Sequence, residues 1–289
     1  MHMATTSRSF GASTLRLTAF LERRFRANVT IRDRLLFDSA HVPPVQKPSS
    51  FVHLYAQLRG AFSIDGGPPV SGPQAYALDE TEFDRRTPGS PTFRSWGGPG
   101  VIVEVRVSAT DLRVPVGLRN GPLTLPSRVW DAYGALAADP SAARLHEVIV
   151  RLGETQILSS DVAASVVPDE PERFVRLWEV LRPLYEDLST SSSLKQIAVV
   201  AKLSLRQLGR DLGEFTRTFG LYGGGFREAI RILRLRAAVL MLSSPDGTPS
   251  DVARLIGYGS LDAMGRAFRD ARLPAPSVVQ DAVRYPDVG

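Results

Sequence analysis

The sequence predicts an α+β protein in which an antiparallel β domain precedes an all-helical C-terminal part. Two observations predict this order. Between residues of about 29 and 118, short alternations of apolar and polar residues are separated by turns rich in glycine and proline, which is typical of antiparallel strands. From about residue 124 onward, apolar residues recur at intervals of three and four, which is the period of a helix.

Length and composition exclude several classes of protein. The chain has 289 residues, enough for two domains, and it contains no cysteine, so disulfides, thiolate metal sites and cysteine nucleophiles are excluded. No apolar run approaches the roughly 18 residues of a membrane span. The polar N-terminus lacks the apolar middle of a secretory signal. We therefore expect a cytoplasmic protein with no membrane partner.

The positive charge of the chain is concentrated in its last third. The hundred residues from Thr190 onward hold 14 of the 35 Lys and Arg residues and nine of the 30 Asp and Glu residues. This segment therefore accounts for the whole net charge of +5, and the preceding 189 residues are neutral. A neutral body with a basic end suggests that the end meets a polyanion, although an excess of this size also arises by chance.

The strand pattern is clearest over residues 51–59, where side chains alternate between two faces. The apolar face holds Val52, Leu54, Ala56 and Leu58, and the mixed face holds Phe51, His53, Tyr55, Gln57 and Arg59. Short strands of this kind predict a sandwich or a small barrel. We expect the apolar face to form the core and the mixed face to be solvated. If the strands instead enclose a pocket, the mixed face would suit an amphipathic or anionic molecule, bound by Tyr55, Arg59 and Trp96.

Three helices are predicted between about 124 and 188. The last of them, over residues 170–188, begins at an acidic segment containing Pro171 and carries a wide apolar stripe that includes Trp178 and Tyr185. Such a stripe packs either inside its own chain or against the same helix of a second chain, and the sequence leaves both alternatives open.

Catalytic and metal-binding signatures are not found in the sequence. The four histidines are scattered, and no pair has the His-x-His spacing that a metal-bearing barrel commonly uses. There is no Gly-x-Ser-x-Gly elbow, and the glycine-rich segments lack the Gly-Lys-Ser/Thr ending of a phosphate-binding loop. We therefore expect neither an enzyme nor a metal site nor a cofactor.

The basic third contains an internal repeat. Residues 194–212 and 249–268 align so that Ala198 matches Ala253, Ser204 matches Ser260 and Arg210 matches Arg266. In each copy a short helix with a small residue is followed by a turn and then by a serine suited to cap the next helix. Residues 226–242 read as one long helix between the copies. The pattern predicts two helix-turn-helix units joined by a long helix.

These residues resemble the DNA-binding domain of the AraC/XylS family of bacterial transcription regulators. The features that carry the resemblance are "SLRQLGRDL", "RLRAAVLML", "DVARLIGYGS" and "AMGRAFRDARLPAPS", which follow one another in order over residues 193–277. The resemblance implies that each unit lays its second helix in the major groove of double-stranded DNA. It also implies a cupin-like barrel for the N-terminal domain, a homodimer and, as further candidate partners, a small-molecule effector and the transcription machinery.

Carrying the family's pattern onto this sequence gives the expected DNA-binding residues. The base-facing set is Arg206, Gly209, Arg210, Leu261, Asp262, Gly265 and Arg266, and Gln207 is a further expected DNA-binding residue. The phosphate neighbours are Lys195, Lys202, Arg269 and Arg272. The chain departs from the pattern in two ways: Gly209 and Gly265 offer no side chain to a base, and Lys202 stands at a turn position where a left-handed backbone is often wanted.

These observations predict a sequence-specific DNA-binding transcription regulator of three parts. Residues 1–188 form the sensing and dimerisation domain, with strands at about 29–118 and helices at about 124–188. Residues 189–193 are a linker, and residues 194–289 form the DNA-binding domain. The alternative is a cupin-type small-molecule binding module or enzyme that carries a degenerate helical domain unable to bind DNA.

Overall fold

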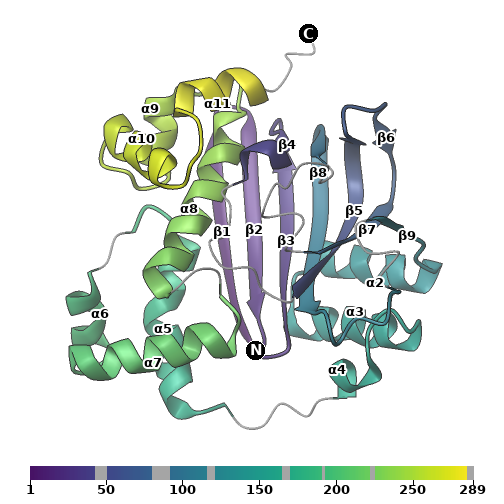
Figure 1. Cartoon of the computed structure of the whole chain (residues 1–289), viewed down its shortest axis with the longest axis horizontal. Coiled ribbons are helices and arrows are strands. Elements are labelled where there is room, and N and C mark those ends of the chain that lie inside the picture. The colour runs from purple at the N-terminus through teal and green to yellow at the C-terminus, as the bar shows by residue number, and fades with distance from the viewer. Residues whose placement is uncertain are drawn as a thin grey trace.

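A computed structural model describes residues 1–42, 51–79, 92–115, 121–164, 170–190, 193–221 and 225–284. It has the predicted fold class, an antiparallel sheet followed by helices (Figure 1). The main strands, in spatial order, are β1 (His2–Phe10), β2 (Ser13–Leu21), β3 (Phe25–Asp33), β8 (Phe93–Ser108), β5 (Phe51–Ile64), β7 (Gln74–Asp79) and β9 (Gly121–Leu123). The short strands β4 (Phe37–Asp38) and β6 (Val70–Ser71) pair with β8 and β5.

The sheet is an open half-barrel. Every strand pairing is antiparallel, and among the described residues no pairing joins the edge strands β1 and β9. The sheet also begins earlier than expected, because β1 and β2 precede residue 29. β1 has the sequence HMATTSRSF, and its buried residues include His2 and Thr6. A strand that buries small and polar side chains lacks the apolar alternation by which strands are found in a sequence.

One face of the sheet is packed against helices in the main apolar core. Val52, Leu54 and Ala56 of β5 lie on this face with Val103 and Val105 of β8, as the alternation predicts. Helices α2 (Ser127–Ala138) and α3 (Ala142–Glu154) cover them, and α4 (Ser160–Ala164) packs beside α3.

The opposite, mixed face of the sheet is covered over most of its length, so the expectation of a solvated face is wrong except at Arg59, which is exposed. His53 is fully buried and Gln57 is 7% exposed. The reason is that helix α8 (Phe226–Leu242) lies along this side of the sheet (Figure 1), and it encloses a cavity with the mixed face. The cover comes from a segment about 170 residues later in the chain, so the local pattern of β5 carries no sign of it.

The C-terminal part contains the two predicted helix-turn-helix units. The first is α6 (Leu194–Val200) with α7 (Leu205–Thr218), and the second is α9 (Pro249–Leu255) with α10 (Leu261–Asp270). Helix α8 joins the units, and α11 (Pro276–Val283) closes the second one against α8.

Helix α5 (Glu172–Glu186) buries its apolar stripe inside its own chain. Phe174, Leu177, Trp178 and Leu181 pack with residues of β1, α6, α7 and α8 in one cluster. Of the two alternatives that the sequence left open, packing within the chain is the one observed. Among the described residues, no helix combines the length and the apolar character that crossing a membrane requires.

Candidate nucleic-acid interface and internal cavity

The first helix of each unit, α6 or α9, begins with a capping box and has a small residue where it crosses the second helix. α6 begins with a capping box in which Ser193 and Gln196 satisfy each other's backbone N–H groups, and α9 begins with the equivalent box of Thr248 and Asp251. The small residues predicted at the helix crossings, Ala198 and Ala253, are both buried.

The turns of the two units share a left-handed residue, and the second turn is one residue longer than the first. Lys202 has φ +56° and Gly257 has φ +85°, so both adopt the left-handed conformation expected at this position. In the second unit only glycine fits, because an added Cβ would lie 2.6 Å from the Cα of Ser189. In the first unit Lys202 is exposed.

The predicted serine caps are present at the start of both second helices. The Ser204 hydroxyl accepts a hydrogen bond from the Gln207 backbone N–H at 3.1 Å, and the Ser260 hydroxyl accepts one from the Ala263 N–H at 3.1 Å. Each cap satisfies one of the free N–H groups that open a helix. Both second helices therefore begin at a serine cap with an extended backbone, with φ −68° at Ser204 and −159° at Ser260.

Helices α7 and α10 each bury one face and expose another. The buried faces include Leu208 and Leu212 in α7, and Met264 and Phe268 in α10. The expected base-facing residues lie on the other face: Arg206, Gly209, Arg210, Leu261, Asp262 and Arg266 are exposed, and Gln207 and Gly265 are half-buried. The expected phosphate neighbours Lys195, Lys202, Arg269 and Arg272 are all exposed as well.

A hydrogen-bonded chain tethers the arginine of α7. The Arg210 guanidinium donates to the Gln207 side-chain oxygen, and the Gln207 amide donates to both carboxylate oxygens of the buried Asp211 at 2.9 Å. The Arg210 side chain nevertheless stays 71% exposed. In α10 the place of Gln207 is taken by Ala263, and within the described part of the chain Arg266 makes no hydrogen bond or ion pair.

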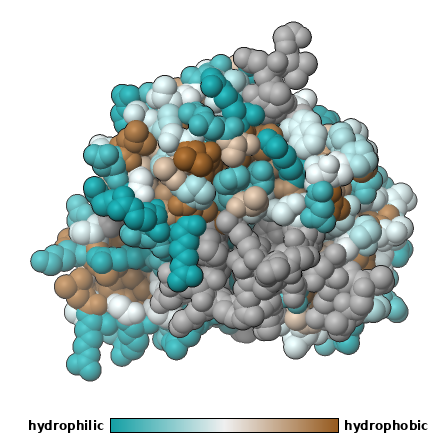
Figure 2. Space-filling view, turned by 45° about the horizontal axis from the view of Figure 1, so that its top comes forward, coloured by the Kyte–Doolittle hydropathy of each residue, from teal (hydrophilic) through white to brown (hydrophobic). Residues whose placement is uncertain are grey.

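The first unit also carries exposed apolar side chains. Val199 and Val200 at the end of α6 and Leu205 at the start of α7 are large, apolar and exposed. Figure 2 shows hydrophobic side chains at the left edge of the molecule, where α6 and α7 lie in Figure 1, with long hydrophilic side chains around them.

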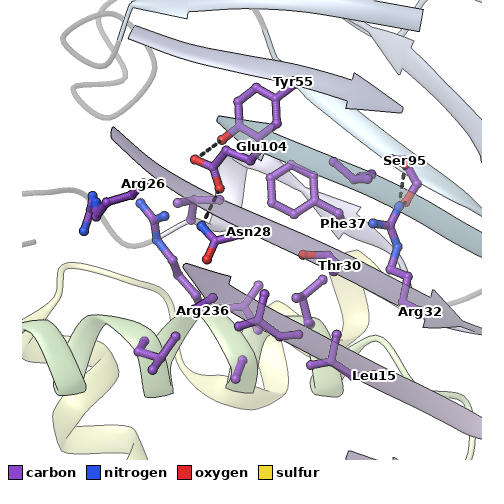
Figure 3. A pocket seen from close by; sticks show the side chains of 18 of the residues that line it. Leu15, Arg26, Asn28, Thr30, Arg32, Phe37, Tyr55, Ser95, Glu104 and Arg236 are labelled. Carbon is purple, nitrogen blue, oxygen red and sulfur yellow. Dashed lines mark hydrogen bonds between the residues drawn. The ribbon is translucent and has the colours of Figure 1, made fainter. Parts of the chain in front are cut away.

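A cavity of about 240 Å³ lies between the mixed face of the sheet and α8 (Figure 3). The sheet contributes apolar side chains such as Leu15 and Phe37 together with polar ones such as Asn28 and Thr30. Helix α8 contributes mainly apolar side chains and one charged residue, Arg236. The helix that joins the two helix-turn-helix units is therefore also a wall of the cavity.

Glu104 is the centre of a polar network on the cavity floor. Its carboxylate accepts hydrogen bonds from the Asn28 amide at 3.0 Å and the Tyr55 hydroxyl at 3.4 Å, and it contacts the buried His53 ring nitrogen (Figure 3). Burial alone would raise the pKa of Glu104. Hydrogen bonding and charge from His53, the charge of Arg236 and the Asn28 hydrogen bond outweigh burial and lower the pKa to about 2. Glu104 is therefore a carboxylate at neutral pH.

A second polar group of the cavity surrounds Arg32. This buried guanidinium donates to the Leu35 carbonyl at 3.2 Å and to Ser95, whose hydroxyl donates to the Gln57 side-chain oxygen at 3.1 Å. The Gln57 side-chain nitrogen is buried and has no hydrogen-bond partner among the described residues. A ligand with an acceptor group would satisfy this nitrogen.

The three expected ligand-binding residues are not brought together. Tyr55 lines the cavity, whereas Arg59 is exposed on β5 and Trp96 packs beside the apolar cluster of α8 to α11. Sequence reasoning missed Glu104, Arg32 and Arg236. The sequence does contain a signal for Glu104. The strand VIVEVRV places the Glu104 carboxylate on the face opposite its valines. In the structure Glu104 is paired with Tyr55 across strands β5 and β8.

No group of three or more His, Asp or Glu side chains that could hold a metal ion is found in the described ranges. The described part of the chain combines three features: an antiparallel half-barrel, a cavity on the mixed face of its sheet, and two helix-turn-helix units with exposed second helices.

The sequence matches no protein-family model and no curated protein. Among solved structures it is similar to the AraC-like transcriptional activator CuxR, with 13% identity and a TM-score of 0.37 over 78% of this chain and 80% of that chain. It is similar to ToxT from Vibrio cholerae, with 10% identity and a TM-score of 0.37 over 90% and 99%. Oxalate decarboxylase OxdC from Bacillus subtilis shows 10% identity and a TM-score of 0.21 over 58% and 41%. At these values the similarities assign neither a family nor a function to this chain.

Proposed function

We propose that the protein is a sequence-specific DNA-binding transcription regulator whose activity is controlled by a small molecule. The observation that carries this proposal is the pair of helix-turn-helix units. Each unit presents an exposed arginine, Arg210 or Arg266, on the outward face of its second helix. Two capped helices joined by one long helix are suited to adjacent turns of the major groove, where arginine pairs with guanine O6 and N7.

The local geometry argues against a degenerate helical domain. Both serine caps are made, both capping boxes are made, and both turns have the left-handed residue. The residues that fill the interior of the units are mainly apolar, and those on the outer faces of α7 and α10 include Arg206, Arg210, Arg266 and Arg269. This division supports a surface for a polyanion.

The cavity supports control by a small molecule. Arg32 and Arg236 bring positive charge to a largely apolar space, and Gln57 brings a side-chain nitrogen without a hydrogen-bond partner among the described residues, which suits an amphipathic or anionic ligand. Helix α8 lines the cavity and connects the two helix-turn-helix units. A ligand that contacts α8 would therefore alter how the two units are oriented toward DNA. We further propose that the protein acts as a homodimer, with the transcription machinery as its protein partner.

DNA binding is tested by titrating the full chain with DNA selected from a random pool, at several salt concentrations. We expect Arg210→Ala and Arg266→Ala each to weaken binding to the selected site by about 1–3 kcal/mol. The matched control is Arg144→Ala, an exposed arginine of α3 far along the chain from the units. If the wild type has no sequence preference and neither variant changes affinity, the proposal is wrong.

Replacing a residue expected to contact phosphate should affect DNA binding differently from replacing a residue expected to contact a base. We expect Lys195→Ala to weaken binding to all DNA sequences alike and to lower the slope of log affinity against log salt by about 1. A change of base preference in this variant would contradict its assignment to phosphate.

Control by a ligand is tested by thermal denaturation with a panel of small metabolites, since a ligand that binds the folded state raises the melting temperature. We expect the stabilising compounds to lose their effect in Ala237→Phe, which fills the cavity from α8. The cavity also favours the alternative function, a binding module without DNA recognition. Stabilising ligands combined with no preference among DNA sequences would support that alternative.

A further inference from the structure

Helices α7 and α10 display the same side chains at equivalent positions. The first residue after each serine cap is an exposed leucine: Leu205 is 51% exposed and Leu261 is 39% exposed. Four residues later each helix has a glycine, and five residues later each has an arginine, Arg210 or Arg266. At 3.6 residues per turn, the glycine lies about 40° around the helix axis from the leucine and the arginine lies about 140° from it, so in each helix the leucine and the arginine flank the glycine in the same order.

The two helices also have the same rotation relative to their units. The serine cap lies one residue before the leucine in both, and the core residues lie at the same intervals: Leu208 and Leu212 in α7, and Met264 and Phe268 in α10. The residues that face outward are therefore equivalent in three dimensions and not only in sequence.

The outward faces differ at two positions. The second residue of the helix is Arg206 in α7 and Asp262 in α10, and both are exposed. The ninth residue is Gly213 in α7 and Arg269 in α10. The faces thus share leucine, glycine and arginine and differ mainly in the sign of one charge beside the leucine.

We propose that the two helices recognise two sub-sites of partly identical sequence. In each sub-site the leucine contacts a thymine methyl group and the arginine pairs with a guanine. The neighbouring base differs, because Arg206 favours guanine whereas Asp262 accepts a hydrogen bond from the amino group of cytosine. This inference rests on the proposed function, and it adds Leu205 to the residues that read DNA.

The space around the helices is compatible with this contact. An added Cβ at Gly209 or Gly265 would meet no atom within 4 Å, so the backbone between the leucine and the arginine is bare on both helices. Base edges can then approach the helix closely at that point. Leu205 and Leu261 are large apolar side chains exposed at the same place in both units, which favours a shared contact.

The test is a selection of double-stranded DNA from a random pool by the full chain, carried out with the wild type, Arg206→Asp and Asp262→Arg. For the wild type we expect two enriched blocks of bases about 10 base pairs apart. Both blocks should contain a thymine and a guanine at the same spacing. The base recognised by Arg206 in the first block should differ from the base recognised by Asp262 in the second. Arg206→Asp should change the preferred base of the first block from guanine to cytosine, by about 5- to 100-fold. Asp262→Arg should make the opposite change in the second block.

The leucine contacts are tested on the selected site by replacing each thymine with deoxyuridine, which removes only the methyl group. We expect about fourfold weaker binding by the wild type, as for the loss of one buried methyl group. Leu205→Ala should bind the thymine and deoxyuridine forms of the first block equally. Val199→Ala, an exposed apolar residue of the same unit that lies outside α7, should keep the wild-type difference.

The outcomes separate this inference from the proposed function. Enrichment of no sequence would overturn both. Enrichment of a site whose two blocks share no bases, or an unchanged first block with Arg206→Asp, would overturn the inference and leave the proposed function standing. Melting temperatures of the variants equal to that of the wild type would show that the exposed substitutions leave the fold intact.

Discussion

Lys202 adopts a left-handed backbone conformation that a residue with a Cβ does not favour. Its φ of +56° matches that of the glycine at the equivalent turn, yet a Cβ makes the left-handed conformation costly by about 1 kcal/mol. We therefore predict that Lys202→Gly raises the free energy of unfolding by up to about 1 kcal/mol, measured by urea denaturation.

The matched control for this prediction is Gly257→Ala in the second turn. There the added Cβ would be strained by φ +85° and would collide with the Cα of Ser189, so the free energy of unfolding should fall by more than about 1 kcal/mol. Two variants that shift stability in the same direction would contradict the equivalence of the turns.

Glu104 makes the stability of the protein depend on pH in the acid range. The folded state lowers its pKa to about 2, below the usual value of 4.5, so the carboxylate contributes stability above pH 4.5 that is lost as the pH falls towards 2. We predict that the stability advantage of the wild type over Glu104→Gln shrinks by about 2 kcal/mol between pH 5 and pH 3. The measurement is urea denaturation of both proteins at each pH, and an advantage that stays constant would contradict the depressed pKa.

For single residues, the sequence predicts the features that depend on neighbouring residues in the chain and not those that depend on distant segments. The caps Ser204 and Ser260 and the turn at Lys202 were predictable, because a cap or a turn depends on the three or four residues around it. The burial of His53 and Gln57 was not, because an alternating strand has the same sequence whether its polar side faces water or a cavity.

At the scale of elements, α7 and α10 each have a well-buried apolar face but contain glycine, which has a low helix propensity, in the helix interior. Glycine costs about 1 kcal/mol relative to alanine within a helix, and nothing lies within 4 Å of a Cβ added at Gly209 or Gly265. We predict that Gly209→Ala and Gly265→Ala each raise the free energy of unfolding by about 0.5–1 kcal/mol, measured by urea denaturation.

The same two substitutions should weaken DNA binding, since the new methyl group would stand where a base edge approaches the helix. A gain in stability with a loss of affinity distinguishes a contact surface from a defect in the fold. Equal affinity of the wild type and both variants would show that DNA does not approach the helices at these glycines.

Elements were predictable where their periodicity is strong. The stripe of α5, which includes Phe174, Leu177 and Leu181, and the helices of both units are visible in the sequence because one face of each is apolar. Strand β1 was outside the expected range, since it buries polar and small side chains such as His2, Ala4 and Thr6 at its inward positions, whereas β2 was missed although Leu15 and Leu17 alternate with polar residues.

At the scale of the whole molecule, the sheet is joined to the C-terminal helices by buried hydrogen bonds just after α8. The Ser243 hydroxyl accepts from the Leu36 backbone N–H at 2.8 Å, and the Ser244 and Ser13 hydroxyls are 2.8 Å apart. Ser243 and Ser244 are both buried. The end of the helix that lines the cavity is therefore fixed to the sheet.

We predict that Ser243→Ala lowers the free energy of unfolding by about 1–3 kcal/mol, because it leaves the Leu36 N–H buried without a partner. Ser250→Ala, an exposed serine of α9, is the control and should change stability by less than about 0.5 kcal/mol. Similar effects of the two variants would mean that the bond between the sheet and the end of α8 contributes little.

The position of α8 also determines which mutations can alter one property of the protein alone. Substitutions on the sheet side of the cavity, at Thr30 or Tyr76 for example, would change which molecules fit and leave the connection between the two units intact. Substitutions at Ile232, Ala237 or Leu240 would change the cavity and that connection together. Under the proposed function, a genetic screen for new small-molecule effectors should recover sheet mutations that leave the preferred DNA site unchanged, whereas mutations in α8 should also change transcription in the absence of the effector.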